Sequence, residues 1–217
     1  MNKIDTFSIA LGTLQTNCYF ITNIQAKATA IVDPATDFPV IYDMINKNGL
    51  KPTAILLTHG HFDHTEAAAE LKSTYNIPII ACADESALLA DANINGSILM
   101  LGAELSISAD HLVTDCETLK LADTAIKVIT TPGHTRGSVC YYIEAENMLF
   151  SGDTLFRESF GRTDFPTGSP AMLAHSIKEK LFALPDETAV YPGHGAASTI
   201  KHEKKHNMIQ HMDPKDI

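Results

Sequence analysis

A short stretch of the sequence carries three imidazoles and one carboxylate within six positions. Residues 59–64 read His-Gly-His-Phe-Asp-His, which is the spacing H-x-H-x-D-H. Imidazole nitrogens and carboxylate oxygens are ligands for zinc, iron or manganese. Side-chain packing does not explain four such groups so close together, and the stretch therefore predicts a metal site.

Three more polar side chains follow predicted strands in the second half of the chain. His134 and His194 each stand after a Pro-Gly turn, and Asp153 follows Gly152. If these strands and the strand before His59 end at one edge, their side chains gather there. The set is too large for a four-coordinate structural zinc and fits one metal or a pair of metals. The candidate ligands are His59, His61, Asp63, His64, His134, Asp153 and His194.

Strands and helices alternate along the chain. In the first half, we expect strands at 4–11, 18–22, 28–32, 53–58 and 77–82, and helices at 40–47, 65–75 and 84–92. In the second half, we expect strands at 118–121, 125–130, 138–144, 148–151 and 188–191, and helices at 171–184 and 198–210. Segments 93–109 and 155–168 lack clear periodicity and are interpreted as irregular. This order predicts an α/β fold, with sheets faced by helices. No linker separates the halves, about 1–115 and 116–217, so one domain is expected over residues 1–217.

Composition limits the classes of partner. The 217 residues carry a formal net charge of −10, which argues against non-specific binding to nucleic acid or anionic membranes. Residues 1–5 lack the apolar core of a signal peptide and no apolar run is long enough to span a bilayer, so a cytoplasmic location is expected. The four cysteines are far apart, and we interpret them as buried free thiols without a disulfide, ligand or nucleophile role.

The stretch 59–64 resembles the H-x-H-x-D-H motif of the metallo-β-lactamase fold superfamily. His134, Asp153 and His194 fall where that family's later ligands occur, and the resemblance covers nearly the whole chain. It implies a four-layer αβ/βα sandwich, in which two mixed sheets are flanked by helices and the metals lie at one edge. It also implies the ligand assignment: His59, His61 and His134 on one metal, Asp63, His64 and His194 on the other, and Asp153 as the bridge. When the second metal is absent, Asp63 is the expected catalytic, proton-handling group.

Segments 152–156, 161–165 and 191–195 resemble the compact bacterial subtype of the glyoxalase II group. These proteins hydrolyse thioesters of glutathione, typically S-lactoylglutathione. The resemblance implies a hydrolase with two divalent ions, with zinc favoured over iron or manganese, and a metal-bridging hydroxide that attacks a small-molecule thioester. The protein is expected to be a monomer or a homodimer. We expect the chain to differ in its choice of thiol from longer members, which grip glutathione with a C-terminal helical domain.

Two other functions are consistent with the sequence. Iron-dependent persulfide dioxygenases share the fold and the Gly-Arg-Thr-Asp-Phe segment at 161–165. In those enzymes two histidines and an aspartate hold one iron, and the matching residues are His59, His134 and Asp153. A non-catalytic, metal-stabilised binding protein is the second alternative, and it predicts closed coordination without an exchangeable water.

Some residues around the candidate ligands have two interpretations. Arg157 and Arg162 could meet a substrate carboxylate, but a local pair between Arg162 and Asp164 is the favoured reading. Asp33 follows a strand as the candidate ligands do. We expect it to be held extended by Pro34 and to hydrogen-bond near a ligand histidine rather than to bind a metal.

Overall fold

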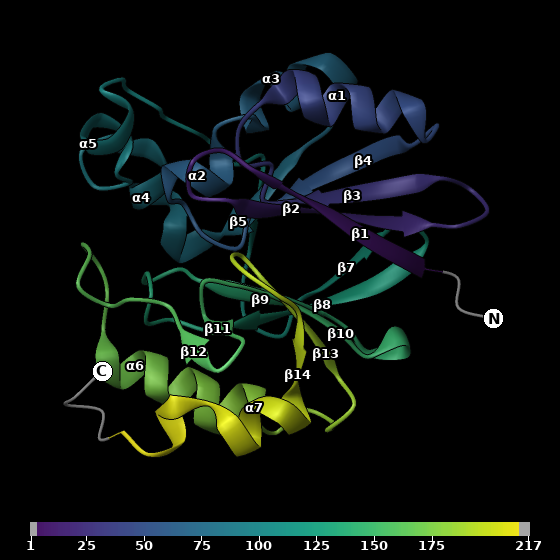
Figure 1. The fold of residues 1–217 in the computed structure, drawn as a ribbon. Helices are drawn as coiled ribbons and strands as arrows, with labels where there is room; N and C mark the ends of the chain where they lie inside the picture. The colour runs from purple at the N-terminus through teal and green to yellow at the C-terminus, as the bar shows by residue number, and fades with distance from the viewer. Residues whose placement is uncertain (1–3, 213–217) are drawn as a thin grey trace.

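Two six-stranded sheets lie face to face in the computed structural model, which describes residues 4–212 (Figure 1). The outer side of the first sheet is covered by α1 (Phe38–Lys47) and α3 (Ala68–Tyr75), and that of the second by α6 (Pro170–His175) and α7 (Ile200–His206). This is the predicted four-layer αβ/βα arrangement, which is therefore confirmed. Met1–Lys3, on which the expected absence of a signal peptide partly rests, lie outside the described residues.

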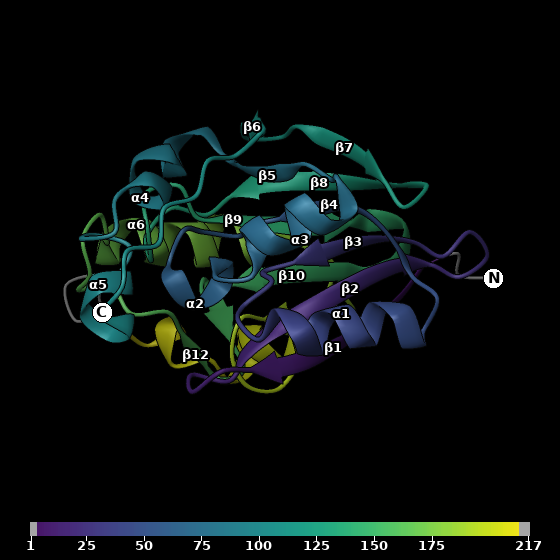
Figure 2. The ribbon, with the colours of Figure 1, turned by 90° about the horizontal axis from the view of Figure 1, so that it is seen from above.

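The two halves of the sequence correspond to the two sheets, which are also seen from above in Figure 2. In the first sheet, the pairs from β1 to β3 are antiparallel and those from β3 to β6 are parallel. Its strands lie in the order β1 (Ile4–Leu11), β2 (Thr16–Asn23), β3 (Ala28–Val32), β4 (Lys51–Leu56), β5 (Ile79–Cys82) and β6 (His111–Val113). The second sheet runs β14 (Ser198–Thr199), β13 (Ala189–Pro192), β10 (Met148–Gly152), β9 (Val139–Ile143), β8 (Thr124–Thr130) and β7 (Thr118–Leu121).

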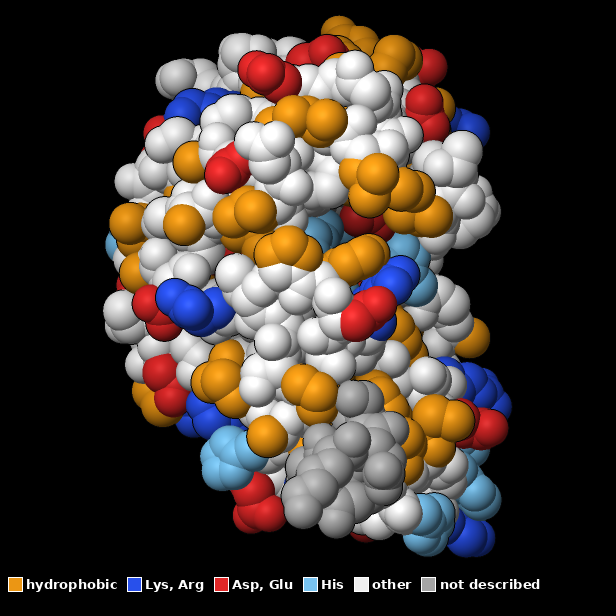
Figure 3. Space-filling view, turned by 90° about the vertical axis from the view of Figure 1, so that its left-hand side faces the viewer, with side chains coloured by type: hydrophobic (Ala, Val, Ile, Leu, Met, Phe, Trp, Pro, Cys, Tyr) orange, Lys and Arg blue, Asp and Glu red, His pale blue; other side chains and the backbone are white. Residues whose placement is uncertain are grey.

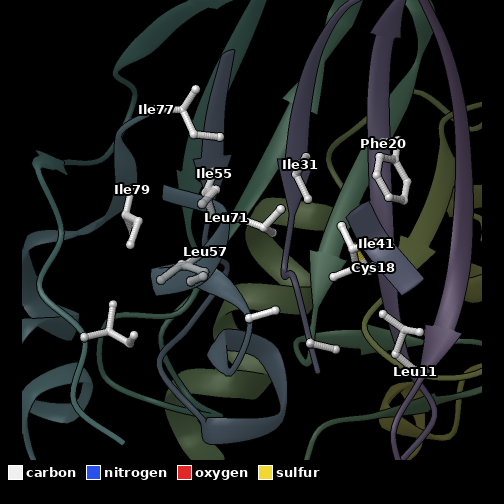
Figure 4. Packing of buried hydrophobic residues seen from close by; sticks show 14 of the residues in the cluster. Leu11, Cys18, Phe20, Ile31, Ile41, Ile55, Leu57, Leu71, Ile77 and Ile79 are labelled. Carbon is white, nitrogen blue, oxygen red and sulfur yellow. The ribbon is translucent and has the colours of Figure 1, made fainter. Parts of the chain in front are cut away.

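Alternation along the strands divides the core into layers. In β2, Cys18 and Phe20 pack toward the helices, whereas Tyr19 and Ile21 pack between the sheets. Figure 4 shows Cys18 and Phe20 with their neighbours from the helix-facing layer. Because both faces of the sheet are buried, its central strands are nearly continuous apolar runs. This is why the sequence predicted these strands well.

Strand direction brings the candidate ligands to one edge. β3 and β4 are parallel, so Asp33 and the segment after β4 leave the first sheet on the same side. β8 and β10 are each antiparallel to β9, and β13 is parallel to β10, so these three strands also share one direction. His134, Asp153 and His194 follow those three strands. The expected convergence at the carboxyl ends of the strands is thus a result of the topology.

Short elements account for most differences from the sequence-based prediction. The helix expected at 65–75 is two helices, α2 (Phe62–Thr65) and α3, and the first begins inside the histidine stretch. Segment 93–109 contains α5 (Ser97–Leu101), and segment 155–168 contains the hairpin of β11 (Leu155–Phe156) and β12 (Ser159–Phe160). The strand β6 was not predicted from the sequence. The helix expected at 84–92 is α4 (Ser86–Ala90), which follows a short 3-10 turn. The helix expected at 171–184 is α6, which continues as a π-helical stretch at Ser176–Leu181. Elements of five or fewer residues are too short to show a hydrophobic period.

The described residues include no helix that is long and apolar enough to cross a membrane. All four cysteines are free, as predicted, and three of them are buried. Cys116 is exposed, which differs from its interpretation as a buried thiol.

Adjacent tyrosines in β9 provide a test of the contact between the sheets. The Tyr141 hydroxyl donates a hydrogen bond of 2.9 Å to the carbonyl oxygen of Leu57, two residues before His59. The Tyr142 hydroxyl is buried and has no hydrogen-bond partner among residues 4–212. We predict that Tyr141→Phe lowers the free energy of unfolding by about 1–2 kcal/mol, because it leaves a buried carbonyl unpaired. Tyr142→Phe, the matched control, should change it by less than about 0.5 kcal/mol. Urea unfolding measures both, and equal effects would contradict the proposed contact.

Candidate metal centre

Seven side chains from both halves of the chain converge at the shared edge of the sheets. They form three overlapping groups, and within each group the potential ligand atoms lie within 4.8 Å of one another. The groups are His59, His61 and His134; His59, His64 and Asp153; and Asp63, His64 and His194. The first and third are the triplets that the family resemblance assigns to two metals. The geometry is compatible with that assignment, and the role of these residues as ligands stays a prediction.

Asp153 lies between the two triplets. Its Oδ1 is 3.4 Å from His64 Nε2, and its Oδ2 is 3.7 Å from His134 Nε2 and 3.4 Å from His194 Nε2. One carboxylate therefore faces histidines of both triplets with its two oxygens. This is the position that a bridging ligand between two ions would occupy.

The local backbone explains how one short stretch can supply both triplets. His59 and His61 lie on the segment after β4, and His61 is extended, with φ −66° and ψ 147°, where it precedes α2. Asp63 and His64 lie inside that helix. The change from extended to helical backbone sends the first two imidazoles and the last two ligand side chains toward different partners. Asp63 is held further by Thr16, whose hydroxyl donates a hydrogen bond of 2.8 Å to Asp63 Oδ2.

Hydrogen bonds to the outer nitrogens fix the tautomers of three histidines. His134 Nδ1 donates to the carbonyl oxygen of Arg162 at 2.7 Å, and His194 Nδ1 donates to that of Leu14 at 3.1 Å. His64 Nδ1 donates to the carboxylate of Asp33 at 2.9 Å. With Nδ1 as the donor, the neutral imidazole presents the Nε2 lone pair to the cluster, as a metal ligand must.

Asp33 connects two of the histidines. It accepts hydrogen bonds from the Thr58 backbone at 2.8 Å and from the Thr58 hydroxyl at 2.7 Å, in addition to the one from His64. Since the Thr58 hydroxyl donates to Asp33, it accepts from His59 Nδ1 at 3.1 Å. The prediction that Asp33 hydrogen-bonds near a candidate ligand is confirmed. The prediction of an extended Asp33 is wrong, because its φ is +49°, a left-handed conformation that aspartate tolerates better than most residues.

Unpaired buried atoms show that the residues fit a metal. His59 Nε2 and Asp153 Oδ1 are buried and have no hydrogen-bond partner within the described part of the chain, and His61 Nδ1 faces His134 Nε2 at 2.9 Å. Buried polar atoms are rarely left unpaired, and a cation among these nitrogens and oxygens would satisfy them. Close approach is possible because Gly193 lacks a side chain: a Cβ there would collide with Asp153 Oδ1. The donor set of imidazoles and carboxylates suits zinc, iron or manganese.

The pKa shifts of the clustered side chains also fit a bound cation. Burial raises the pKa of Asp153, but His64, His194 and His134 together outweigh burial and lower it to about 2. Burial lowers the pKa of His64, yet Asp63, Asp153 and Asp33 together raise it to about 9. The pKa of His194 is raised to about 10, since the bonds to Asp153 and Asp63 exceed the effect of its burial. By contrast, burial and the neighbouring His134 lower the pKa of His61 to about 3. Ionised carboxylates thus attract cations, and His61 is neutral and able to bind one.

The two arginines have different surroundings. Arg162 forms a two-point ion pair with Asp164, with both N–O distances 2.6 Å, so the favoured local-pair interpretation is confirmed. Its guanidinium also stacks on Phe165, at 3.9 Å from the ring centroid, and that ring contacts His61. Arg157 is exposed in the turn between β11 and β12, and its charge acts on Glu158, which pairs with His202. The described contacts therefore link Arg162 to the cluster but do not link Arg157 to it.

Glu85 is a supporting residue that the sequence did not reveal. It is buried, and its two oxygens accept hydrogen bonds of 2.8 Å from the backbones of Gly60 and Gly137. Gly60 stands between His59 and His61, whereas Gly137 lies three residues after His134. One carboxylate thus ties together the two loops that carry the first triplet. In the sequence, Glu85 was interpreted only as part of a helix start, and nothing local indicated a partner 52 residues away.

Residues 11–194 match the family model of the metallo-beta-lactamase superfamily. The chain belongs to the metallo-beta-lactamase superfamily. A relative from Bacillus subtilis (strain 168), named "Probable metallo-hydrolase YqgX", is 39% identical over 198 residues, which are 91% of this chain and 93% of the relative. A relative from Haemophilus influenzae, named "Hydroxyacylglutathione hydrolase GloC", is 31% identical over 201 residues, covering 92% and 94% of the two chains.

Solved structures of the superfamily share the fold closely. The B3 metallo-beta-lactamase BLEG-1 has a TM-score of 0.90 and 40% identity, covering 94% of this chain and 98% of its own. TTHA1623, solved in a di-iron-bound form, has a TM-score of 0.83 and 32% identity, covering 93% and 98%. Superfamily membership together with the histidine-rich cluster supports a metal-dependent hydrolase.

The carboxylate of Glu85 can be tested against an exposed control. Glu85→Gln keeps the volume but turns an amide N–H₂ toward one of two backbone donors. We predict that this lowers the free energy of unfolding by about 2–3 kcal/mol, because a buried N–H loses a charged acceptor. Glu104→Gln changes an exposed carboxylate and should alter stability by less than about 0.5 kcal/mol. Denaturant unfolding compares the two, and a neutral Glu85→Gln would show that the bridge contributes nothing.

Proposed function

We propose that the protein is a metal-dependent thioesterase of the compact glyoxalase II type, which hydrolyses a small-molecule thioester such as S-lactoylglutathione. The observation that carries this proposal is the position of Asp153, whose carboxylate faces histidines of both triplets. A carboxylate so placed supports a two-metal hydrolytic site. The Haemophilus influenzae relative, named as a hydroxyacylglutathione hydrolase, supports the substrate class.

The residues that would hold the ions are His59, His61 and His134 for one, Asp63, His64 and His194 for the other, and Asp153 for both. Two divalent ions, when bound, would lower the pKa of a water between them and polarise a carbonyl oxygen. Zinc is the proposed ion, with iron or manganese as alternatives, and the di-iron form of TTHA1623 shows that a relative accepts iron. Since the ligands come from both halves, we also propose that residues 1–217 act as one domain.

The chain's own residues would orient the attacking water. Thr16 occupies Asp63 Oδ2 with a hydrogen bond, which leaves Oδ1 to accept a proton from that water. The water oxygen bonds to the thioester carbonyl carbon, and the C–S bond breaks with its electron pair on sulfur. Asp63 then returns its proton to the thiolate, so that the products are a carboxylic acid and a thiol. Because a thiolate is a good leaving group, no strong general acid is required.

Substrate contacts are proposed at the rim of the cluster. Arg162 is exposed, and its guanidinium stacks on Phe165 beside His61, so it is placed to exchange Asp164 for a substrate carboxylate. Arg157 is a weaker proposal, because its described contacts lead toward Glu158 and His202.

Activity and metal content, measured on one preparation, test the proposal. We predict at least one equivalent of zinc or another divalent ion per chain, and hydrolysis of S-lactoylglutathione that a chelator abolishes and added metal restores. Elemental analysis and thiol release measure the two. Because BLEG-1 is described as a B3 metallo-beta-lactamase, a chromogenic β-lactam belongs in the same assay as the second candidate substrate.

Other outcomes would replace this proposal. Oxygen uptake with glutathione persulfide, stoichiometric iron and no thioester cleavage would identify a dioxygenase. Bound metal with no turnover of any of these substrates would favour a binding protein. Cleavage of the β-lactam alone would identify a β-lactamase.

Substitution of the bridging residue connects metal to activity. We predict that Asp153→Ala and His134→Ala each reduce bound metal and lower kcat/KM by more than about a hundredfold, because each removes a ligand atom. His175→Ala alters an exposed histidine of α6 outside the cluster and should leave both values unchanged. Full hydrolysis by the Asp153→Ala protein would exclude the assigned role of Asp153.

A further inference from the structure

Helix α5 presents four consecutive apolar side chains to solvent. Ile98, Leu99, Met100 and Leu101 are 39%, 81%, 56% and 42% exposed. A run of exposed apolar residues is unfavourable on a protein surface unless it has a function. The run is therefore a candidate contact surface, and of its four side chains Leu101 lines the cavity described below.

The base of this helix is fixed beside the candidate metal centre. The backbone of Phe62, in α2, donates a hydrogen bond of 3.1 Å to the carbonyl oxygen of Asn95. The Asn95 side chain accepts from the Ser97 backbone at 2.9 Å and donates to the carbonyl oxygen of Leu105 at 2.8 Å, which closes the segment on itself. The segment before α5 is thus anchored to Phe62, which is the neighbour in sequence of the candidate ligand Asp63.

A cavity of about 580 Å³ joins α5 to the candidate metal centre. Leu11, Leu14, Phe62 and Leu101 supply its apolar lining, and Asp63 lies at the cluster. In Figure 3, histidine side chains are recessed in this face, with hydrophobic side chains gathered above them. The volume is in the range of small-molecule sites.

The charge of the lining restricts what the cavity can hold. It contains the carboxylates of Asp37, Asp63 and Glu66, and none of its lining residues in the described part of the chain is a lysine or arginine. Arg157 and Arg162 do not line it. A second carboxylate on a ligand would be repelled here, whereas an apolar chain would contact Leu14, Phe62 and Leu101.

We propose that this cavity is an acyl subsite, which binds an uncharged, apolar acyl chain of the thioester while the scissile carbonyl lies at the candidate metal centre. Leu101 sets the preference for chain length, and Asp37 with Glu66 excludes acyl chains that end in a carboxylate. The inference rests on the proposed thioesterase function and names the substrate class of that site.

Three thioesters of one neutral thiol, N-acetylcysteamine, provide the test on the wild-type protein. The acyl groups are acetyl, hexanoyl and 5-carboxypentanoyl, the last two having equal length. We expect kcat/KM for the hexanoyl thioester to exceed that for the acetyl thioester by about tenfold, because methylenes leave water for the apolar part of the cavity lining. The 5-carboxypentanoyl thioester should lose that gain.

A variant and a matched control locate the effect. Leu101→Ala should lower kcat/KM for the hexanoyl thioester by about tenfold and leave the acetyl thioester unchanged. Leu112→Ala removes a side chain of β6 that is 48% exposed and does not line the cavity, and it should change neither value. Thermal unfolding and size-exclusion chromatography of both variants check that each is folded and has the oligomeric state of the wild-type protein.

Three results would overturn the subsite. They are equal rates for all three thioesters, an equal loss of both activities in Leu101→Ala, and a change of oligomeric state in that variant with the chain-length preference intact. The last result would show that a second copy covers α5. Equal rates for all three substrates would leave the thioesterase function standing, whereas no cleavage of any thioester would overturn that function and the subsite together.

Discussion

Two carboxylates, Asp63 and Asp153, lie at the centre of a mostly buried cluster and keep their charge only beside positive partners. Water cannot screen them well there, so protons on histidine or a bound cation must balance them. Both carboxylates contact His64 and His194. The negative charge of the carboxylates raises the pKa of these two histidines, which favours their protonated, positively charged forms. Much of the surrounding structure serves to keep the charged atoms close to one another and away from solvent.

That arrangement depends on supports some distance from the cluster centre. Asp33 is held in a left-handed conformation at the end of β3, and from there it orients His64 directly and His59 through Thr58. Glu85 contributes a second buried carboxylate, which is satisfied by backbone N–H groups from both halves. Each support is a buried carboxylate that accepts hydrogen bonds from the segments carrying the candidate ligands, and so fixes their geometry.

The sequence was most informative where chemistry or burial left a local pattern. The spacing of His59, His61, Asp63 and His64 indicated the cluster, and apolar runs such as 54–57 indicated strands buried on both faces. It was least informative where structure arises from contacts distant in sequence. Glu85 has partners 25 and 52 residues away, and α5 has only five residues, so neither leaves a period or motif. The cavity beside Asp63 is lined by β1, the β1–β2 turn, α2 and α5, so no single segment of the sequence predicts it.

The candidate ligands are divided between the halves: four come from the stretch 59–64, and three from residues 134, 153 and 194. An ion shared by both groups would be a further cross-link between two sheets, which already meet through apolar packing and through hydrogen bonds such as the one from Tyr141 to Leu57. Neither sheet could form the complete site alone, so full occupancy would follow the joining of the halves during folding. By linkage, the free energy of ion binding would then add to the work of separating them. In such a protein, loading with metal and the final docking of the sheets are one thermodynamic event.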